Sequence, residues 1–343
     1  MAQHKLKKLF EPQSIAVVGA SDREGSLGHA VWQRLRAHPF AGRAYPVNPK
    51  HKLVGGEVCF ARMTDLPERV DLALIAAPAS ACETILRECG ASGCNYALML
   101  SHGFGAGVTA EDHAATQKLA DAARKARVRL VGPYARGLLR PRIALDASAM
   151  TDVGTMPSPG SLAVLSQSGA WLSILRDYVA GSSIGFSSLL SLGASLDLDF
   201  GELLDYFSFD AQTSDVLLYI EEVKDAPEFM SGVRQISRMK PVVVLKADRA
   251  DLHRAPDGTH ATALARHDRV FDAAIARAGA VRVDTAMQMV AAARLLTGDR
   301  SRTQQRVAAI TNGRGPGLVA SDAVHARGLT MATLSEETTA ALA

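Results

Sequence analysis

Short apolar runs alternate with longer helical stretches along the chain, and this alternation most limits what the chain can fold into. In the first half, the runs that we predict as strands are residues 15–18, 45–47, 72–76, 96–100 and 129–131. The stretches that we predict as helices between them are residues 28–37, 81–90 and 111–127. Short apolar strands separated by helices pair in parallel and are covered on both faces. The sequence therefore predicts a doubly wound α/β domain over residues 1–150.

A second alternating series follows residues 154–160, a stretch rich in proline and glycine that we predict as a linker between domains. Its predicted strands are residues 162–165, 187–190, 216–220, 242–245 and 281–283. Residues 284–296 are predicted as the closing helix. The second α/β domain is therefore expected over residues 151–300.

Residues 301–343 begin a third series, with predicted strands at 306–311 and 329–333 and a helix at 318–327. Two strands and one helix cannot bury a hydrophobic core of their own. We therefore expect that this segment is the incomplete start of a third ligase-like α/β subdomain in a fragment of a longer protein, or that it packs against another surface.

Composition excludes some classes of function. The net charge is only +3 and aromatic residues make up 5% of the chain, which argues against nucleic acid as a partner. The longest uncharged stretch, 178–196, is rich in serine and glycine and does not suit a membrane helix. The four cysteines form no CxxC pair, and no secretory signal precedes them, so we expect buried thiols in a cytoplasmic protein.

The first predicted strand runs into a glycine-rich turn, GASDREGSLG, from Gly19 to Gly28. Glycines let the backbone approach a ligand, and the following helix N-terminus offers N–H groups to phosphate. The turn lacks GxGxxG spacing, and Asn48 and Lys50 follow the second strand, where a NAD site has an acidic residue. The pattern favours another phosphorylated nucleotide and counts against an NAD(P)-dependent oxidoreductase. A tight turn without a ligand is the alternative.

Three further strand ends carry loops of small or polar residues, centred on Pro78, His102 and Pro133. Ligands of open α/β sheets bind outside the carboxyl ends of the strands. These loops and the glycine turn are therefore predicted to line one crevice. His102 taken alone is more typical of a structural or solvent-facing histidine.

The second domain offers two weaker candidates for function. Ser166, Ser168 and Gly169 lie between a predicted strand and a helix, where a helix N-terminus attracts anions, although serine is also a routine helix cap. Glu221 follows the strand 216–220, and its alternative role is a solvated acid at the surface.

Three histidines, His253, His260 and His267, recur at intervals of seven residues. Two helical turns separate successive members of such a series, which is too far for one metal ion. The segment is better explained by a single nucleophilic histidine, because an imidazole can carry a phosphoryl group near neutral pH. We predict no metal site.

A resemblance to a known family rests on seven segments in a fixed order: LFEPQSIAVVGASDREGSLG, AYPVNPK, VDLALIAAPA, GPYARGLLRP, AVLSQSGA, DVLLYIEEVKDAPEFM and KPVVVLKADRA. On these segments the chain resembles the ADP-forming acyl-CoA synthetases, relatives of the succinyl-CoA synthetase α subunit. The segment SLGASLDLDFGELLDYFSFDAQTSDVLLYIEEV is most similar to bacterial proteins in which this ligase-like region is fused to a GNAT lysine acetyltransferase domain.

The resemblance implies a Rossmann-like CoA-binding domain followed by a flavodoxin-like domain of the succinyl-CoA synthetase type. It assigns CoA or acetyl-CoA binding to Gly19, Ala20, Ser21, Ser26, Gly28, Asn48, Lys50, Pro78, Ala79, His102 and Gly103. In the second domain it places the phosphoryl-carrying histidine at His260 and the carboxylate that orients it at Glu221. It assigns phosphate binding to Ser166, Ser168 and Gly169.

The implied activity is that of an acid–thiol ligase acting on a small carboxylic acid or its acyl-CoA. A phosphoryl group would pass between an acyl phosphate and ADP through the histidine, while CoA exchanges the acyl group. ATP or ADP and magnesium would enter only through an ATP-grasp region, which this sequence lacks. The expected partners are therefore an ATP-grasp region or subunit and a GNAT acetyltransferase domain, and a homo-oligomer is left open.

Two positions depart from the family pattern. Tyr134 stands where the ligases read asparagine in a GPN motif, and Arg266 adds a charge to a loop that normally contains glycine. These departures favour a non-catalytic CoA or acetyl-CoA sensor that regulates a lysine acetyltransferase. His260 favours the ligase, and both hypotheses stay open on the sequence.

Overall fold

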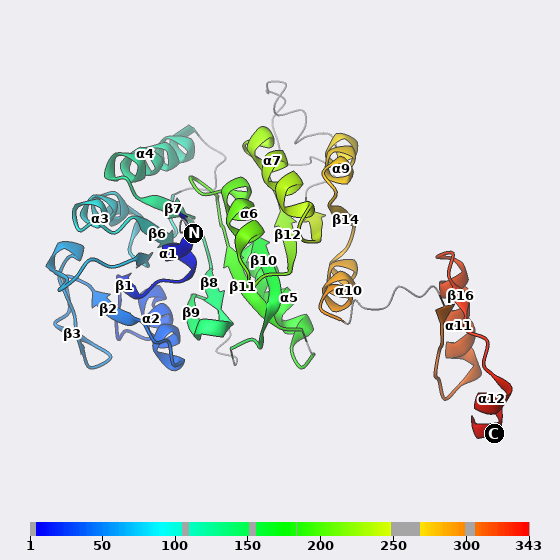
Figure 1. Cartoon of the computed structure of the whole chain (residues 1–343). Coiled ribbons are helices and arrows are strands. Elements are labelled where there is room, and N and C mark those ends of the chain that lie inside the picture. Colours follow the sequence, from blue (N-terminus) through cyan, green and yellow to red (C-terminus); the bar gives the residue numbers. More distant parts are fainter. Residues whose placement is uncertain are drawn as a thin grey trace. The chain divides into compact units, whose positions relative to one another are not determined.

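The computed structural model describes residues 5–104, 110–150, 156–182, 184–247, 268–298 and 306–342. The chain divides into two units, Met1–Thr297 and Gly298–Ala343 (Figure 1). The first unit holds two parallel-rich sheets with helices on both faces of each, as the alternating sequence predicts.

The first sheet has five parallel strands in the order β2-β1-β5-β6-β7. Their bounds are β1 Ser14–Val18, β2 Arg43–Val47, β5 Leu72–Ile75, β6 Tyr96–Met99 and β7 Arg129–Val131. Alternate residues of β1 face opposite sides of the sheet: Ile15 and Val17 join one core, and Ala16 and Val18 the other. The chain reverses its direction of winding between β1 and β5, which is where ligands of doubly wound sheets bind.

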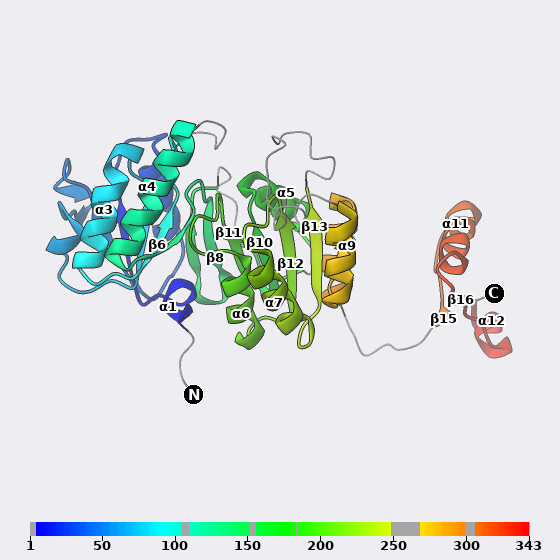
Figure 2. The same cartoon turned by 90° about the horizontal axis from the view of Figure 1, so that it is seen from above.

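Helix α2 (Leu27–Ala37) covers one face of this sheet, and α3 (Ala79–Ala91) and α4 (Ala110–Ala126) cover the other (Figures 1 and 2). All four cysteines are buried free thiols in these layers. A short helix, α1 (Lys7–Phe10), precedes β1, and a one-turn 3-10 helix, η1 (Met63–Asp65), precedes β5. A hairpin of β3 (Leu53–Val54) and β4 (Glu57–Val58), which the sequence reading did not predict, follows β2.

The second sheet has seven strands in the order β14-β13-β12-β10-β11-β8-β9. Its parallel strands are β10 Pro159–Ser166, β11 Phe186–Ser191, β12 Asp215–Ile220, β13 Val242–Lys246 and β14 Val281–Val283. Helices α6 (Phe200–Phe209), α7 (Ala226–Ser237) and α9 (Asp268–Arg277) pack on one face. Helices α5 (Gly169–Val179) and α10 (Ala286–Leu296) pack on the other.

Two strands before the expected domain boundary belong to this second sheet. β8 (Gly137–Arg140) pairs antiparallel with β11, and β9 (Leu145–Ser148) pairs antiparallel with β8 after the 3-10 turn η2 (Pro141–Ile143). The chain therefore changes sheet directly after β7, earlier than residue 150, and β10 begins inside the predicted linker. Apolar periodicity identifies a strand but not its partner, and this partner lies about 50 residues away in sequence.

The two sheets share one hydrophobic core and are joined by ion pairs. Arg34 of α2 contacts Asp146 of β9 at 3.2 Å, with only 5% and 2% of the two residues exposed. Arg129 of β7 pairs with Glu202 of α6 and with Asp197 before it. These contacts hold the first sheet against the second across a buried boundary.

Asp146→Ala is expected to lower the free energy of unfolding by about 3–5 kcal/mol, because it leaves the Arg34 charge buried without its partner. Asp146 also accepts hydrogen bonds from the Ser148 N–H and hydroxyl. Glu57→Ala is the matched control, since it removes the partner of Arg36, an exposed arginine on the same helix, and should cost less than about 1 kcal/mol. Urea unfolding measures both, and equal losses would contradict the role of burial.

The second unit is small, as the sequence indicates. It holds the parallel pair β15 (Arg306–Val307) and β16 (Thr330–Met331) with helices α11 (Arg314–His325) and α12 (Glu336–Leu342). Both strands are shorter than predicted, and they pair only with each other within the described part of this unit. Of the residues described in this unit none is buried, and the Ile310 side chain is fully exposed.

Candidate functional site

The glycine turn after β1 is packed against backbone on both sides. Gly19 has a φ of +94°, and a Cβ at this position would lie 2.5 Å from the carbonyl oxygen of Ala76, directly after β5. A Cβ on Gly28 would lie 1.8 Å from the carbonyl oxygen of Gly19. Both positions therefore require glycine, which brings the first turn of α2 onto the strand ends at the point where the sheet reverses.

Side chains around the turn hold its shape. Ser26 caps α2, because its hydroxyl accepts a hydrogen bond from the His29 N–H and donates one to the Arg23 carbonyl. The Ser21 hydroxyl accepts a hydrogen bond from the Arg23 N–H. The first turn of α2 carries no acidic side chain, so the positive end of the helix dipole is not neutralised there.

Asn48 has a positioning role that the sequence reading did not assign to it. Its amide donates to the Ala20 carbonyl at 2.8 Å, and its side-chain oxygen accepts from the Lys50 N–H at 3.0 Å. The amide nitrogen thus ties the end of β2 to the glycine turn, while the amide oxygen holds the shape of the loop that follows β2. The Lys50 side chain is exposed beside this turn, where a cation suits a phosphate group.

The loops after β5 and β6 meet at the same edge. Pro78 is the N-cap of α3, and a Cβ on Gly103 would touch the Cβ of Ala79 at 3.4 Å. The His102 ring lies 5.6 Å from the ring of Tyr134, whose hydroxyl accepts a hydrogen bond from the Phe104 N–H. The structure therefore brings the predicted loops and the glycine turn to one edge of the first sheet.

Because backbone occupies the Cβ positions of Gly19 and Gly28, the N-terminus of α2 lies directly at the strand ends, where its main-chain N–H groups can receive a phosphate. The residues at this edge therefore fit the negatively charged pyrophosphate of CoA. They offer a helix N-terminus, a hydroxyl cap and an exposed lysine. They do not offer the acidic residue after β2 that a NAD ribose requires.

The second sheet presents a second cluster at its own carboxyl edge. Ser168 caps α5 by accepting from the Trp171 N–H, and the Ser166 hydroxyl donates to the Ser168 carbonyl at 2.7 Å. Glu221 follows β12, the strand next to β10. Both segments leave neighbouring parallel strands at the same end, so the candidates of the second domain lie together.

Gln167 joins these two segments directly. Its side-chain oxygen accepts from the N–H groups of Glu221 at 2.6 Å and Glu222 at 2.9 Å, and its amide donates to the Glu222 carbonyl at 2.8 Å. The side chain is buried, and it pairs with the backbone of the other loop as a neighbouring strand would. The sequence reading missed Gln167, although its place between Ser166 and Ser168, both predicted to bind phosphate, was a usable indication.

The Glu221 carboxyl and backbone have distinct surroundings. Partial burial raises the pKa of the Glu221 carboxyl, and burial together with the negative charge of that carboxylate raises the pKa of Tyr219. The Glu221 carbonyl accepts a hydrogen bond from Lys246, a buried lysine at the end of β13, at 3.3 Å. His260, like His253, His267 and Arg266, lies outside the described residues.

Arg136 lies between the two clusters and was also missed. Its aliphatic stem packs against Gly169, where a Cβ would come within 1.9 Å of its Cγ. Its charge acts on His102, whose pKa is lowered by partial burial and further by Arg136. Arg136 belongs to the segment GPYAR, and nothing in that segment by itself relates it to the loop that contains Ser166 and Ser168, which we call the serine loop. The serine loop is about 30 residues further along the chain.

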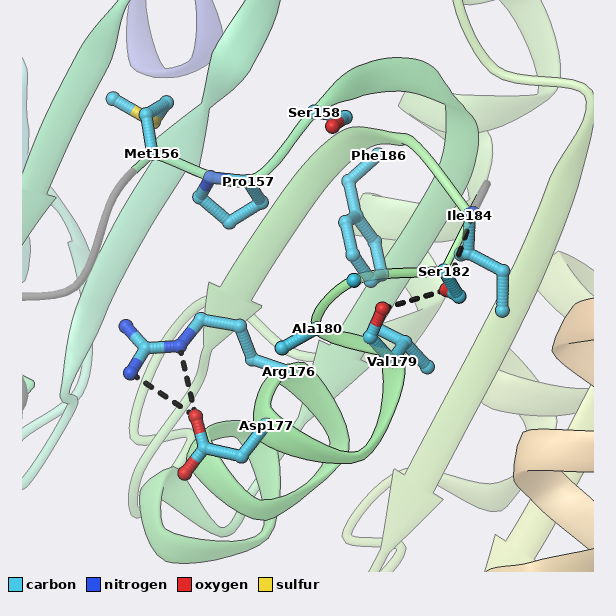
Figure 3. Close-up of a pocket in the computed structure, with 11 residues that line it drawn as sticks. Met156, Pro157, Ser158, Arg176, Asp177, Val179, Ala180, Ser182, Ile184 and Phe186 are labelled. Atoms are coloured by element: carbon cyan, nitrogen blue, oxygen red, sulfur yellow. Dashed lines mark hydrogen bonds and ion pairs between the residues drawn. The ribbon is translucent and has the colours of Figure 1, made fainter.

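A cavity of about 170 Å³ lies at the opposite edge of the second sheet, where β10 and β11 begin (Figure 3). It is lined by Met156, Pro157, Ser158, Arg176, Asp177, Val179, Ala180, Gly181, Ser182, Ile184 and Phe186. Arg176 and Asp177 are joined beside it by an ion pair of 3.3 Å (Figure 3). Pockets for drug-sized ligands measure roughly 300–1,000 Å³, so this cavity is too small for a nucleotide.

The part of the chain that the structure describes contains neither a helix that could span a membrane nor a cluster of metal-ligating side chains. There, no helix has the length and apolar character needed to cross a membrane. Over the same residues, no group of three or more His, Cys, Asp or Glu is placed to hold a metal ion.

Comparison with known proteins agrees with the two-domain architecture. The family described as CoA binding domain matches residues 13–140, and the succinyl-CoA ligase like flavodoxin domain matches residues 159–296. These matches confirm the predicted fold class: a CoA-binding α/β domain followed by a flavodoxin-type domain.

Individual relatives extend over nearly the whole chain. The α subunit of acetate–CoA ligase (ADP-forming) I from Pyrococcus furiosus is 35% identical over 94% of this chain and 70% of that subunit. The acetate–CoA ligase (ADP-forming) of Methanocaldococcus jannaschii is 32% identical over 93% of this chain, which spans only 44% of that protein.

A solved structure of an acetyl-coenzyme A synthetase has a similar fold over nearly the whole chain. The dinucleotide-forming acetyl-coenzyme A synthetase 1 of Ca. Korarchaeum cryptofilum, in complex with phosphate and ADP, is similar with a TM-score of 0.84 at 27% identity. The similarity covers 97% of this chain and 71% of that one. The ordered segments, the two domain matches and the extent of identity lead to one conclusion: the chain belongs to the family of the ADP-forming acetate–CoA ligases.

Proposed function

We propose that the chain is the CoA-binding part of an ADP-forming acyl-CoA synthetase in which His260 carries the phosphoryl group. The observation that carries this proposal is the side chain of Gln167, which holds Glu221 against the serine loop at the N-terminus of α5. A carboxylate and a positive helix end on adjacent loops are the two groups that a phosphohistidine requires. The helix end stabilises the phosphoryl oxygens, and the carboxylate holds the other imidazole nitrogen as a donor.

CoA supplies the thiol that accepts or releases the acyl group. The residues of the first domain bind and orient it: the turn from Gly19 to Gly28 receives the phosphates, and Lys50 balances their charge. Pro78, Ala79, His102 and Gly103 line the adjoining strand ends. The lowered pKa of His102 favours its neutral form there.

The nucleotide step is proposed to require a partner. Relatives named as α subunits indicate a second subunit, and an ATP-grasp region on it would bring ATP or ADP and magnesium to His260. A fused GNAT acetyltransferase domain stays a proposal that rests on the resemblance of residues 191–223 alone.

CoA is expected to bind this chain at least about tenfold more tightly than NAD does, because an Asn48–Lys50 pair replaces the acidic residue of a NAD site. Calorimetric titration of the chain with each ligand in turn gives both dissociation constants. Lys50→Ala should weaken CoA binding, whereas Lys8→Ala, which removes an exposed lysine paired with Asp71, should not. Tighter binding of NAD would overturn the assignment of the first domain.

A non-catalytic CoA or acetyl-CoA sensor is the second candidate, and Tyr134 favours it. Its backbone is left-handed, with a φ of +60°, and its hydroxyl is held at 2.8 Å from the Phe104 nitrogen. A large ring is thus fixed where the ligases have a small amide. A chain that binds CoA but takes up no phosphate from an active ATP-grasp partner would favour the sensor over the ligase.

A further inference from the structure

The loop after β11 makes two left-handed turns, at Gly193 with a φ of +60° and at Ser195 with a φ of +45°. A non-glycine residue in this conformation is strained and persists only where its surroundings hold it. Here the carbonyl oxygens of Ala194 and Ser195 both accept hydrogen bonds from the ammonium group of Lys224, at 2.5 and 3.1 Å. Lys224 therefore holds two consecutive carbonyls of this loop.

The other side of the same loop contacts the segment after β7. The Ala194 N–H donates to the Pro133 carbonyl at 2.8 Å, and the Leu196 N–H donates to the Gly132 carbonyl at 3.0 Å. A Cβ on Gly193 would lie 2.1 Å from the Pro133 oxygen. The loop after β11 therefore packs directly on Gly132 and Pro133. The next residue, Tyr134, contacts the loop of His102 and Gly103 through its hydrogen bond with the Phe104 N–H.

Lys224 belongs to the segment that carries Glu221. Gln167 holds the start of that segment, and Asp225, the N-cap of α7, holds its end by accepting from the Glu228 N–H. Between these two points, Lys224 reaches out of the segment to the loop after β11. The Glu221 segment is thereby connected through Gln167 to the serine loop and through Lys224 to the loop after β11.

We propose that Lys224 is a positioning residue that sets the Glu221 segment against the loop after β11. Its effect on phosphoryl transfer rests on the proposed function, whereas its effect on the two loops does not. Without the ammonium group, the carbonyls of Ala194 and Ser195 lose their shared donor. The Glu221 segment then loses these hydrogen bonds to the loop after β11, which itself bonds the segment after β7.

Lys224→Met tests this proposal, because methionine keeps an unbranched, flexible stem and removes the charge. Lys240→Met is the matched control: the Lys240 ammonium also donates to two carbonyls, those of Phe207 and Asp210, but outside this cluster. In Lys224→Met, hydrogen exchange at the amides of Ala194, Leu196 and Glu221 should accelerate about tenfold. Lys240→Met should leave these amides unchanged, and Lys224→Arg should restore their protection.

The kinetic measurement uses the full chain with an ATP-grasp partner. Lys224→Met should lower the rate of phosphate uptake about tenfold while CoA affinity stays within about threefold, since the glycine turn is held by the first sheet. If the wild type takes up no phosphate, the proposed function fails and the exchange measurement still decides the role of Lys224. Unchanged exchange in Lys224→Met, or equal acceleration at these amides in Lys240→Met, would overturn the proposal.

Discussion

His260→Ala should abolish the uptake of acid-labile phosphate when the chain is supplied with an active ATP-grasp partner, ATP and magnesium. The physical reason is that, under the proposed function, the imidazole is the phosphoryl carrier, and alanine has no nucleophilic nitrogen to take its place. CoA affinity should change by less than about twofold, because the CoA turn is in the other domain. Radiolabelled phosphate and calorimetry measure the two quantities on the same preparation.

Two histidines in the same segment serve as controls for this result. His253→Ala and His267→Ala should take up phosphate normally, since an offset of seven residues places them about 10 Å away even on a continuous helix. Glu221→Gln should slow the uptake without preventing it, because an amide keeps the shape but not the charge that orients the imidazole. If the wild type is not labelled by a partner that labels an authentic α subunit, the sensor hypothesis replaces the ligase.

Gly19→Ala should weaken CoA binding about 100-fold, because a shift of the turn by roughly 1 Å is enough to misplace groups that must meet a ligand closely. The added methyl group would lie 2.5 Å from the Ala76 carbonyl oxygen, so the backbone of the turn must move. Calorimetric titration with CoA measures the loss, and circular dichroism confirms that the variant is folded.

Gly181→Ala is the control for Gly19→Ala, because it replaces a glycine of positive φ without creating a steric clash. Gly181 has a similar positive φ of +76°, but nothing lies within 4 Å of a Cβ there. The variant should lose about 1 kcal/mol of stability and keep its CoA affinity. A comparable loss of affinity in both variants would show that the packed turn is not the binding element.

The sequence by itself determined the class of the fold and the place of its glycine turn. Apolar runs such as Ile15–Val18 are too short for helices, and their separation by amphipathic stretches leaves parallel pairing with covered faces as the solution. The glycines of GASDREGSLG were informative for a similar reason. Gly28 is required by a close contact with Gly19, which is near in sequence, whereas the contact of Gly19 with the Ala76 carbonyl forms only when β5 lies beside β1.

Only the tertiary structure decided which strands share a sheet and which side chains hold the candidate site. β8 and β9 look like a continuation of the first domain, but pairing with β11 places them in the second sheet. Gln167 meets Glu221 across 54 residues of chain, and Lys224 meets Ala194 across 30. Local propensity and periodicity carry no information about such pairs, because their hydrogen bonds form only when distant strands have been brought to a common edge.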